Sequence, residues 1–305
     1  MEFFSHKTEI NFMAQRKWAA LFSGILFTIA IVSLIVKGLD FGLDFTGGTQ
    51  IQVSYAAAAD AGKIRQELNQ VGFEDAVVQA YGSSKNVMIK LKPHKELTSQ
   101  ALNDKVAGAL KDAKIDRIEY IGPQVGQALV TNGILAVIVS LLAIMIYIAL
   151  RFEYRFAISA ALSLIHDPVI ILGVFSLFGL EFNLISLAAV LTVLGYSLND
   201  TIVVYDRARE NFRKYRKAEA PEILNLAVNQ TLSRTIMTSG LSLAIITALL
   251  IFGGSMLFGF ALVMIIGIVI GTYSSIYVAG ALALMMGLNR THFMLPEKKF
   301  VDNMP

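Results

Sequence analysis

Long apolar runs with almost no charge dominate the chain and alternate with short polar connections. A helix needs roughly 20 apolar residues to cross a bilayer core about 30 Å thick. The stretch 235–289 contains no Asp, Glu, Lys or Arg and is long enough for two such helices, with glycines at 253, 254 and 259 marking the break. The pattern therefore predicts six membrane-spanning helices, at about residues 18–36, 128–150, 157–180, 182–205, 235–252 and 258–288.

The segment 37–127, between the first two predicted spans, has a different pattern. It holds 22 charged residues in 91 positions, a density close to that of a soluble domain. Strand-like and helix-like patterns follow one another in the order βαββαβ, which is typical of the ferredoxin-like fold. The expected strands are 49–55, 76–81, 86–91 and 114–121, and the expected helices are 60–71 and 97–110. The predicted fold class is a polytopic α-helical membrane protein with a small ferredoxin-like α+β domain between helices 1 and 2.

Composition supports this division and excludes several other classes of protein. Hydrophobic residues make up 55% of the chain and charged residues 16%, whereas a soluble domain carries about 25% charged residues. The mean hydropathy is +0.60, and the chain contains no cysteine. A single soluble globule, a disordered chain and a disulfide scaffold are therefore excluded.

Basic residues in the short connections predict the orientation of the spans. Cytoplasmic loops of membrane proteins carry an excess of Lys and Arg. The connections after spans two and four are rich in Lys and Arg, whereas those near Glu181 and Gly254 contain none. We therefore expect an inner-membrane protein with cytoplasmic tails at 1–17 and 290–305 and a periplasmic domain at 37–127. The first span, 18–36, is expected to be a retained helix, and the five-helix bundle is expected over 128–289.

Two aspartates within the predicted spans are candidates for function. Asp167 lies near the middle of the third span beside His166, and Asp200 lies near the cytoplasmic end of the fourth, between Asn199 and Thr201. A carboxylate at the bilayer centre costs about 2.5–3.5 kcal/mol, so such groups usually face a bundle interior and have a partner. They are candidate proton carriers, because burial favours the neutral form and a nearby cation the charged form.

Arg234, expected at the start of the fifth span, is the candidate cation for Asp200. The alternative for Asp200 is a residue near the membrane interface that only caps a helix. The alternative for Asp167 is a structural aspartate beside the kink at Pro168. His166 has no second ligand nearby in the sequence, so a structural histidine is the favoured interpretation over a metal ligand or a proton relay.

Other chemistry receives little support from the sequence. Ser197 with His166 on the neighbouring span suggests a serine hydrolase, but Ser197 lacks the flanking glycines of a nucleophile elbow. We therefore expect no catalytic residues, no metal site and no cofactor. The basic residues between 207 and 217 are explained by the cytoplasmic membrane surface, so no nucleic-acid partner is expected.

Four motifs in register with the predicted topology resemble the SecD/SecF family of protein-export membrane proteins. The stretch from Phe41 to Gly48 reads FGLDFTGG directly after the first span, and His166-Asp167 lies in the third. The fourth span ends in LNDTIVVYDR from Leu198, and the fifth opens with LSRT from Leu232. The order of six spans with one insert is similar to the smaller member of the SecD–SecF pair.

This resemblance implies a fold of the resistance–nodulation–division type, in which two six-span halves pair in the membrane. It implies SecD as the other half, the SecYEG channel and accessory Sec subunits as partners, and an exported polypeptide as substrate. The family uses the proton-motive force to help complete export. By motif, Asp200 is expected to carry the proton with Arg234 as its charged partner, and Asn199 and Thr201 are polar neighbours. The motif residues Gly42, Asp44, Gly47 and Gly48 are expected to shape the junction between the first span and the insert.

Two other functions fit the same pattern. The first is half of a proton-coupled exporter of small solutes, which would need a substrate pocket and usually has a larger insert. The second is a purely structural subunit in which Asp200 and Arg234 only hold helices together. No nucleotide-binding loop or metal cluster favours an enzyme.

Overall fold

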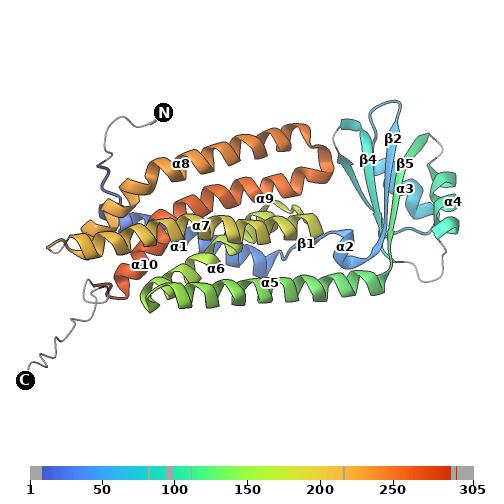
Figure 1. The fold of residues 1–305 in the computed structure, drawn as a ribbon. Coiled ribbons are helices and arrows are strands. Elements are labelled where there is room, and N and C mark those ends of the chain that lie inside the picture. Colours follow the sequence, from blue (N-terminus) through green and yellow to red (C-terminus); the bar gives the residue numbers. More distant parts are fainter. Residues whose placement is uncertain are drawn as a thin grey trace, which may run out of the picture.

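The computed structural model describes residues 9–81, 83–93, 99–110, 112–215, 217–289 and 293. The molecule is elongated, with a helical bundle joined at one end to a separate sheet (Figure 1). Across these described residues, six helical segments are long and apolar enough to span a membrane, as the hydrophobic pattern predicts. They are Met13–Val36 (mainly α1, Arg16–Val36), α5 (Pro123–Arg151), α6 (Tyr154–Phe178), α7 (Leu184–Lys214), α8 (Ala220–Phe252), and Met256–Met285, which comprises most of α9 (Gly254–Tyr273), the π-helical turn η2 (Ser274–Val278) and α10 (Ala279–Met285).

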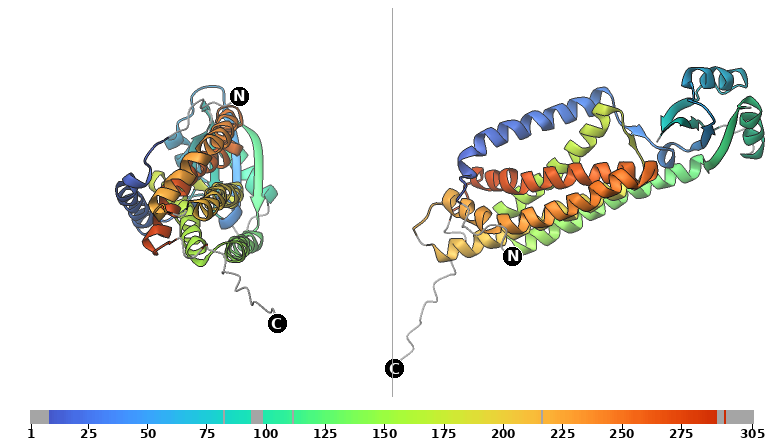
Figure 2. Two further views of the ribbon diagram at one scale, coloured as in Figure 1. Left: turned by 60° about the vertical axis from the view of Figure 1, so that its left-hand side comes forward. Right: turned by 90° about the horizontal axis from the view of Figure 1, so that it is seen from above.

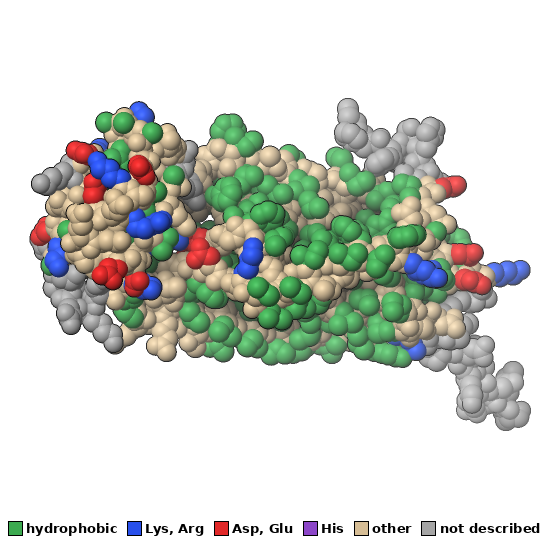
Figure 3. Space-filling model, turned by 180° about the vertical axis from the view of Figure 1, so that it is seen from behind, with side chains coloured by type: hydrophobic (Ala, Val, Ile, Leu, Met, Phe, Trp, Pro, Cys, Tyr) green, Lys and Arg blue, Asp and Glu red, His purple; other side chains and the backbone are tan. Residues whose placement is uncertain are grey.

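Packing distinguishes the helices of the bundle. Half of the most apolar window of α6 and of α7 is buried, compared with 11% for α5 and for α8. In the end-on view, α1 lies at the edge of the bundle (Figure 2). Hydrophobic side chains cover the middle of the molecule, and charged side chains gather towards its two ends (Figure 3). This distribution is what a bilayer requires, because charged groups are excluded from its apolar core.

Residues 48–121 form the sheet domain. The strands β2 (Gly48–Tyr55), β3 (Val77–Tyr81), β4 (Ser83–Leu91) and β5 (Ala113–Ile121) pair antiparallel in the order β3-β4-β2-β5. The helices α3 (Ala61–Gln70) and α4 (Ser99–Ala109) complete the predicted βαββαβ order. Alternate strand residues such as Ile51 and Ile89 form an apolar core with Leu68 and Val106 from the helices.

A short junction between α1 and the sheet domain packs on the bundle. It contains β1 (Asp40–Phe41), which pairs in parallel with β6 (Glu181–Phe182), and α2 (Leu43–Thr46). The sequence assigned 37–47 and 123–127 to the inserted domain, but α5 already begins at Pro123 and the sheet begins at Gly48. At the first boundary the difference arises because β1 is held by a tertiary partner, β6, that lies 141 residues further along the chain.

Beyond the expected spans, α7 and α8 extend past the end of the bundle that is remote from the sheet. The sequence predicted a basic loop at 207–217, but α7 continues to Lys214. Arg234 was expected to begin the fifth span, whereas α8 begins at Ala220 with a capping box between Glu219 and Glu222. Apolar residues in the added turns, including Phe212, Leu224 and Val228, pack into the main core, which explains why the helices persist.

Gly48, the first residue of β2, has a backbone conformation and surroundings that leave no room for a side chain. Its φ angle is +126°, and a Cβ atom would lie 2.3 Å from the carbonyl oxygen of Leu91. We expect Gly48→Ala to destabilise the sheet domain by about 2 kcal/mol or more, since backbone strain is added to a clash. Gly72→Ala is the matched control, because Gly72 has a φ of +93° but open space around it. The temperature at which the sheet domain becomes sensitive to protease, measured on the purified chain, reports the stability of each variant. Equal losses of stability in Gly48→Ala and Gly72→Ala would contradict the clash at Gly48.

Candidate functional site

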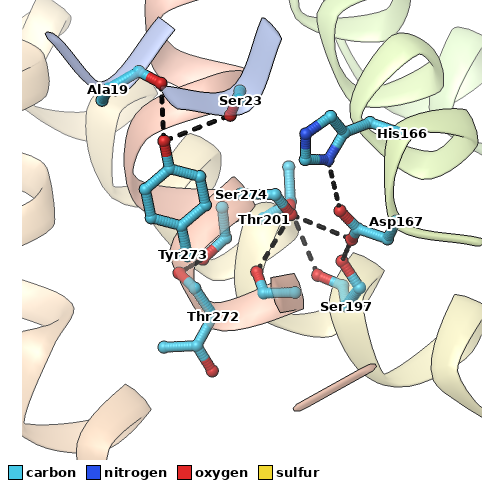
Figure 4. A network of polar contacts seen from close by, with 11 residues as sticks. Ala19, Ser23, His166, Asp167, Ser197, Thr201, Thr272, Tyr273 and Ser274 are labelled. Atoms are coloured by element: carbon cyan, nitrogen blue, oxygen red, sulfur yellow. Dashed lines mark hydrogen bonds and ion pairs between the residues drawn. The ribbon is translucent and has the colours of Figure 1, made fainter. Parts of the chain in front are cut away.

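Asp167 is the centre of a buried polar network between three helices (Figure 4). Its side chain is fully buried in α6. One carboxylate oxygen, Oδ2, accepts hydrogen bonds from Ser197 Oγ of α7 at 2.5 Å and from Ser274 Oγ of η2 at 2.9 Å. The other, Oδ1, lies 2.9 Å from His166 Nδ1. Asp167 therefore has three polar neighbours and connects α6, α7 and the sixth span.

The π-helical turn η2 and two glycines allow these helices to come together. The turn begins at Ser274, which faces Asp167. A Cβ atom at Gly271 would lie 2.9 Å from Ser197 Cβ, and one at Gly267 would lie 2.3 Å from Val193 Cγ2. The GxxxG spacing in the sixth span thus serves close packing against α7. A π-turn inside a helix is often found at functional sites.

Polar side chains continue along the seam between α6 and α7. Ser159 and Tyr205 lie 2.6 Å apart through their hydroxyl oxygens, and Thr201 Oγ1 donates to the Ser197 carbonyl at 3.3 Å. Ser163 lies on α6 between Ser159 and Asp167. It is buried, and its hydroxyl has no partner among the described residues. The seam is therefore polar from Asp167 towards the end of the bundle remote from the sheet.

Asp200 lies on α7, one turn beyond Ser197, in a different environment from Asp167. Only 4% of the residue is exposed, and its Oδ2 atom has no hydrogen-bond partner in the described part of the chain. Thr201 turns towards Ser197, and Asn199 is exposed on the surface of the bundle. At a rise of 1.5 Å per residue, Asp200 lies about 24 Å along α7 from Leu184. It is a buried carboxylate with unused hydrogen-bonding capacity.

Arg234 lies on α8 and is exposed. Among the described residues, neither Asp200 nor Arg234 forms an ion pair within 4.0 Å. The direct pairing of these two residues therefore stays a prediction.

Among the described residues, His166 and Ser197 each contact Asp167, and no hydrogen bond joins them as a nucleophile and its base. Ser197 Oγ donates its hydrogen bond to Asp167, whereas the ring of His166 stacks on Phe27 with a centroid distance of 6.0 Å. The Nε2 atom of His166 is buried and has no partner in the part of the chain that is described. Within that same part, no group of three His, Cys, Asp or Glu residues could hold a metal ion.

Sequence reasoning named Asp167, His166, Asp200 and Thr201 but missed Ser163 and Ser274. A spacing of four residues was the available signal. Ser159, Ser163 and Asp167 recur at this spacing on one span, and Ser197, Thr201 and Tyr205 recur on the next. Residues four apart share a helix face, so two such series on consecutive antiparallel spans indicate a polar seam. No comparable spacing marks Ser274, which the π-turn places.

Comparisons with known protein families give a consistent result. Residues 101–289 match the family model described as "Protein export membrane protein SecD/SecF, C-terminal", and residues 32–59 match the "SecD/SecF GG Motif". The chain is similar to the protein translocase subunit SecF of Vibrio alginolyticus, with 48% identity over 94% of this chain and 93% of the relative. It is also similar to that of Pseudomonas aeruginosa, with 46% identity over 97% of this chain and 98% of the relative.

A solved structure has the same fold over nearly the whole chain. The crystal structure of SecDF from Thermus thermophilus, titled a translocon-associated membrane protein, aligns with a TM-score of 0.86 and 36% identity. The alignment covers 93% of this chain and 39% of that chain, so this chain spans well under half of the longer protein. A structure of SecDF in a super-membrane-facing form aligns over the same share of both chains with a TM-score of 0.69.

Proposed function

The chain belongs to the SecD/SecF family of protein-export membrane proteins, and we propose that it is a SecF-type subunit that helps complete polypeptide export at the expense of the proton-motive force. The observation that carries the proton role is Asp200, a buried carboxylate in a membrane-spanning helix with an unpartnered oxygen. A proton can bind to that oxygen without displacing a hydrogen-bond donor of the described chain. The family membership supports the export role.

In this proposal Asp200 carries the proton, and Asp167 holds helices together through its hydrogen bonds. Three polar neighbours hold Asp167, so its carboxylate is engaged in contacts that join helices. Protonation of Asp200 from the outside removes its attraction to Arg234 and allows α7 and α8 to shift. Release of the proton to the cytoplasm restores the attraction. A proton crossing 100 mV supplies about 2.3 kcal/mol for this movement. His166 joins α6 to α1 through the stacked Phe27 ring, and the Thr201 hydroxyl bonds back to the Ser197 carbonyl of its own helix.

A SecD-type subunit is the proposed partner in the membrane. Small or polar residues are exposed along one face of α7, whereas a surface that faces lipid usually carries large apolar side chains: Ala188, Thr192, Gly195 and Asn199. Together with the exposed Arg234 they form a surface suited to close helix packing and polar contacts with a second bundle. The fused SecDF chain of the solved relative also supports this partner. The SecYEG channel, accessory Sec subunits and the exported polypeptide complete the proposed set.

We also propose the orientation and the class of the sheet domain. Basic residues at the end of the bundle remote from the sheet support cytoplasmic termini in the inner membrane. The sheet domain is then periplasmic. Its strand order β3-β4-β2-β5 supports assignment to the ferredoxin-like class.

Depletion of this chain from its host tests the function. We expect precursors of exported proteins to accumulate. The rate of export should fall most when a proton gradient is present, because only the gradient-dependent part of export needs this subunit. Pulse-labelling of a precursor with and without a protonophore measures both parts. An exporter of small solutes would instead give drug sensitivity with unchanged precursor processing, and that outcome would replace the export role.

A further inference from the structure

The ion pair between Lys90 and Glu181 joins the sheet domain to the bundle. Lys90 Nζ of β4 lies 2.5 Å from Glu181 Oε2 of β6. The two side chains are only 15% and 27% exposed, so the pair is partly shielded from water. Glu181 belongs to the short connection between α6 and α7, the two helices that carry Asp167 and Asp200. This contact therefore reaches from the sheet domain to the acid-bearing helices.

A second set of contacts ties the junction to the first turn of α7. Asp44 Oδ2 accepts a hydrogen bond from the backbone N–H of Leu184 at 2.9 Å, and the N–H of Gly42 donates to the carbonyl of Phe182 at 2.9 Å. A Cβ atom at Gly42 would lie 2.9 Å from Asn183 Cβ and 3.2 Å from Asn183 Cα, so a larger residue would push the junction away from the start of α7. The junction is thus fixed to the end of the helix that carries Asp200.

The covalent chain also joins the sheet domain to the bundle at the same place. Gly47 and Gly48, which follow the junction, have φ angles of +67° and +126°. The return connection passes through Gly122 directly into α5. The sheet domain is therefore attached to α5 through the chain (Figure 1) and, through Lys90, to Glu181 of β6 just before α7.

From this arrangement we propose that Lys90, Glu181 and Asp44 form a brace, through which a displacement of α7 sets the pose of the sheet domain. The three are positioning residues, since none of them lies beside Asp200. This proposal rests on the proposed function, because it takes the displacement of α7 from the proton cycle of Asp200. It assigns to these three residues the transmission of that displacement from α7 to the sheet domain.

The test uses Lys90→Gln and Glu181→Gln in the full chain, assembled with its partner subunits. We expect the stimulation of export by the proton gradient to fall about fivefold, the lower end of coupling between sites. Gradient-independent export should be unchanged. The charge exchange Lys90→Glu with Glu181→Lys should restore the stimulation. Lys92→Gln is the matched control, because Lys92 lies two residues further along and pairs with Asp75 inside the sheet domain at 3.0 Å.

A distance measurement separates transmission from simple support. Because the chain has no cysteine, Ala57→Cys in the sheet domain and Phe178→Cys at the end of α6 can carry spin labels, with a partner subunit free of cysteine. We expect Asp200→Asn to shift the label–label distance distribution when Lys90 is present and to leave it unshifted in Lys90→Gln. If Lys90→Gln keeps both the gradient stimulation and the shift, the brace is wrong while the proton role of Asp200 stands. If Asp200→Asn itself changes neither export nor distance, both proposals fail.

Discussion

Asp200→Asn is expected to remove the dependence of export on the proton gradient while the subunit still assembles with its partners. Asparagine has nearly the same shape as aspartate but carries no proton that titrates. The stimulation of precursor export by the gradient should fall about tenfold or more, since proton transfer at a positioned carboxylate is lost. Export in vesicles with an imposed gradient measures the effect, and co-purification of the partner subunits reports assembly.

Asp206→Asn is the control for this substitution. Asp206 lies on the same helix, six residues further along, and pairs with Arg151 at 3.1 Å. Both side chains are well exposed, at 48% for Arg151 and 39% for Asp206, so the pair contributes little to stability. We expect Asp206→Asn to leave the gradient stimulation unchanged. An assembled Asp200→Asn complex with normal stimulation would show that Asp200 is not the carrier.

The membrane spans and the order of the insert were predictable because each rests on a local pattern. A bilayer requires about 20 apolar residues in a row, and a half-buried strand requires alternation, so both requirements are visible in short windows. The strands at 49–55 and 86–91, for example, appear as Gly48–Tyr55 and Ser83–Leu91. The two aspartates were also predictable, since a charge in an apolar run is conspicuous.

The errors fall where a distant segment decides the structure. Asp40 and Phe41 form a strand only because Glu181 and Phe182 pair with them, and no local signal marks that pairing. The extension of α7 to Lys214 looked like a basic loop, because its apolar residues are sparse and become visible only through their contacts with α8. The partners of Asp167 come from three helices, so its stronger anchoring relative to Asp200 could not be read from the sequence.

Asp167 and Asp200 lie on neighbouring helices and are both buried, yet their surroundings predict different effects of substitution. Substitution of Asp167 should lower stability, whereas substitution of Asp200 should lower gradient-dependent export. Asp167→Ala removes the acceptor from Ser197, Ser274 and His166 and leaves these polar groups buried without a partner. We expect a loss of about 3–5 kcal/mol, the cost of breaking a buried charged network. Thermal unfolding of the purified complex and its yield from membranes measure this loss.

Asp167→Asn separates anchoring from proton transfer. The amide retains one acceptor oxygen, so part of the network survives, and we expect the complex to assemble with the gradient stimulation of export preserved. Ser176→Ala on the same helix is the control, because it removes a single hydroxyl pair with Ser33, 2.9 Å apart, and should cost only about 1 kcal/mol. If Asp167→Asn assembles but loses the stimulation, Asp167 carries the proton as well, and its three neighbours serve as a relay instead of an anchor.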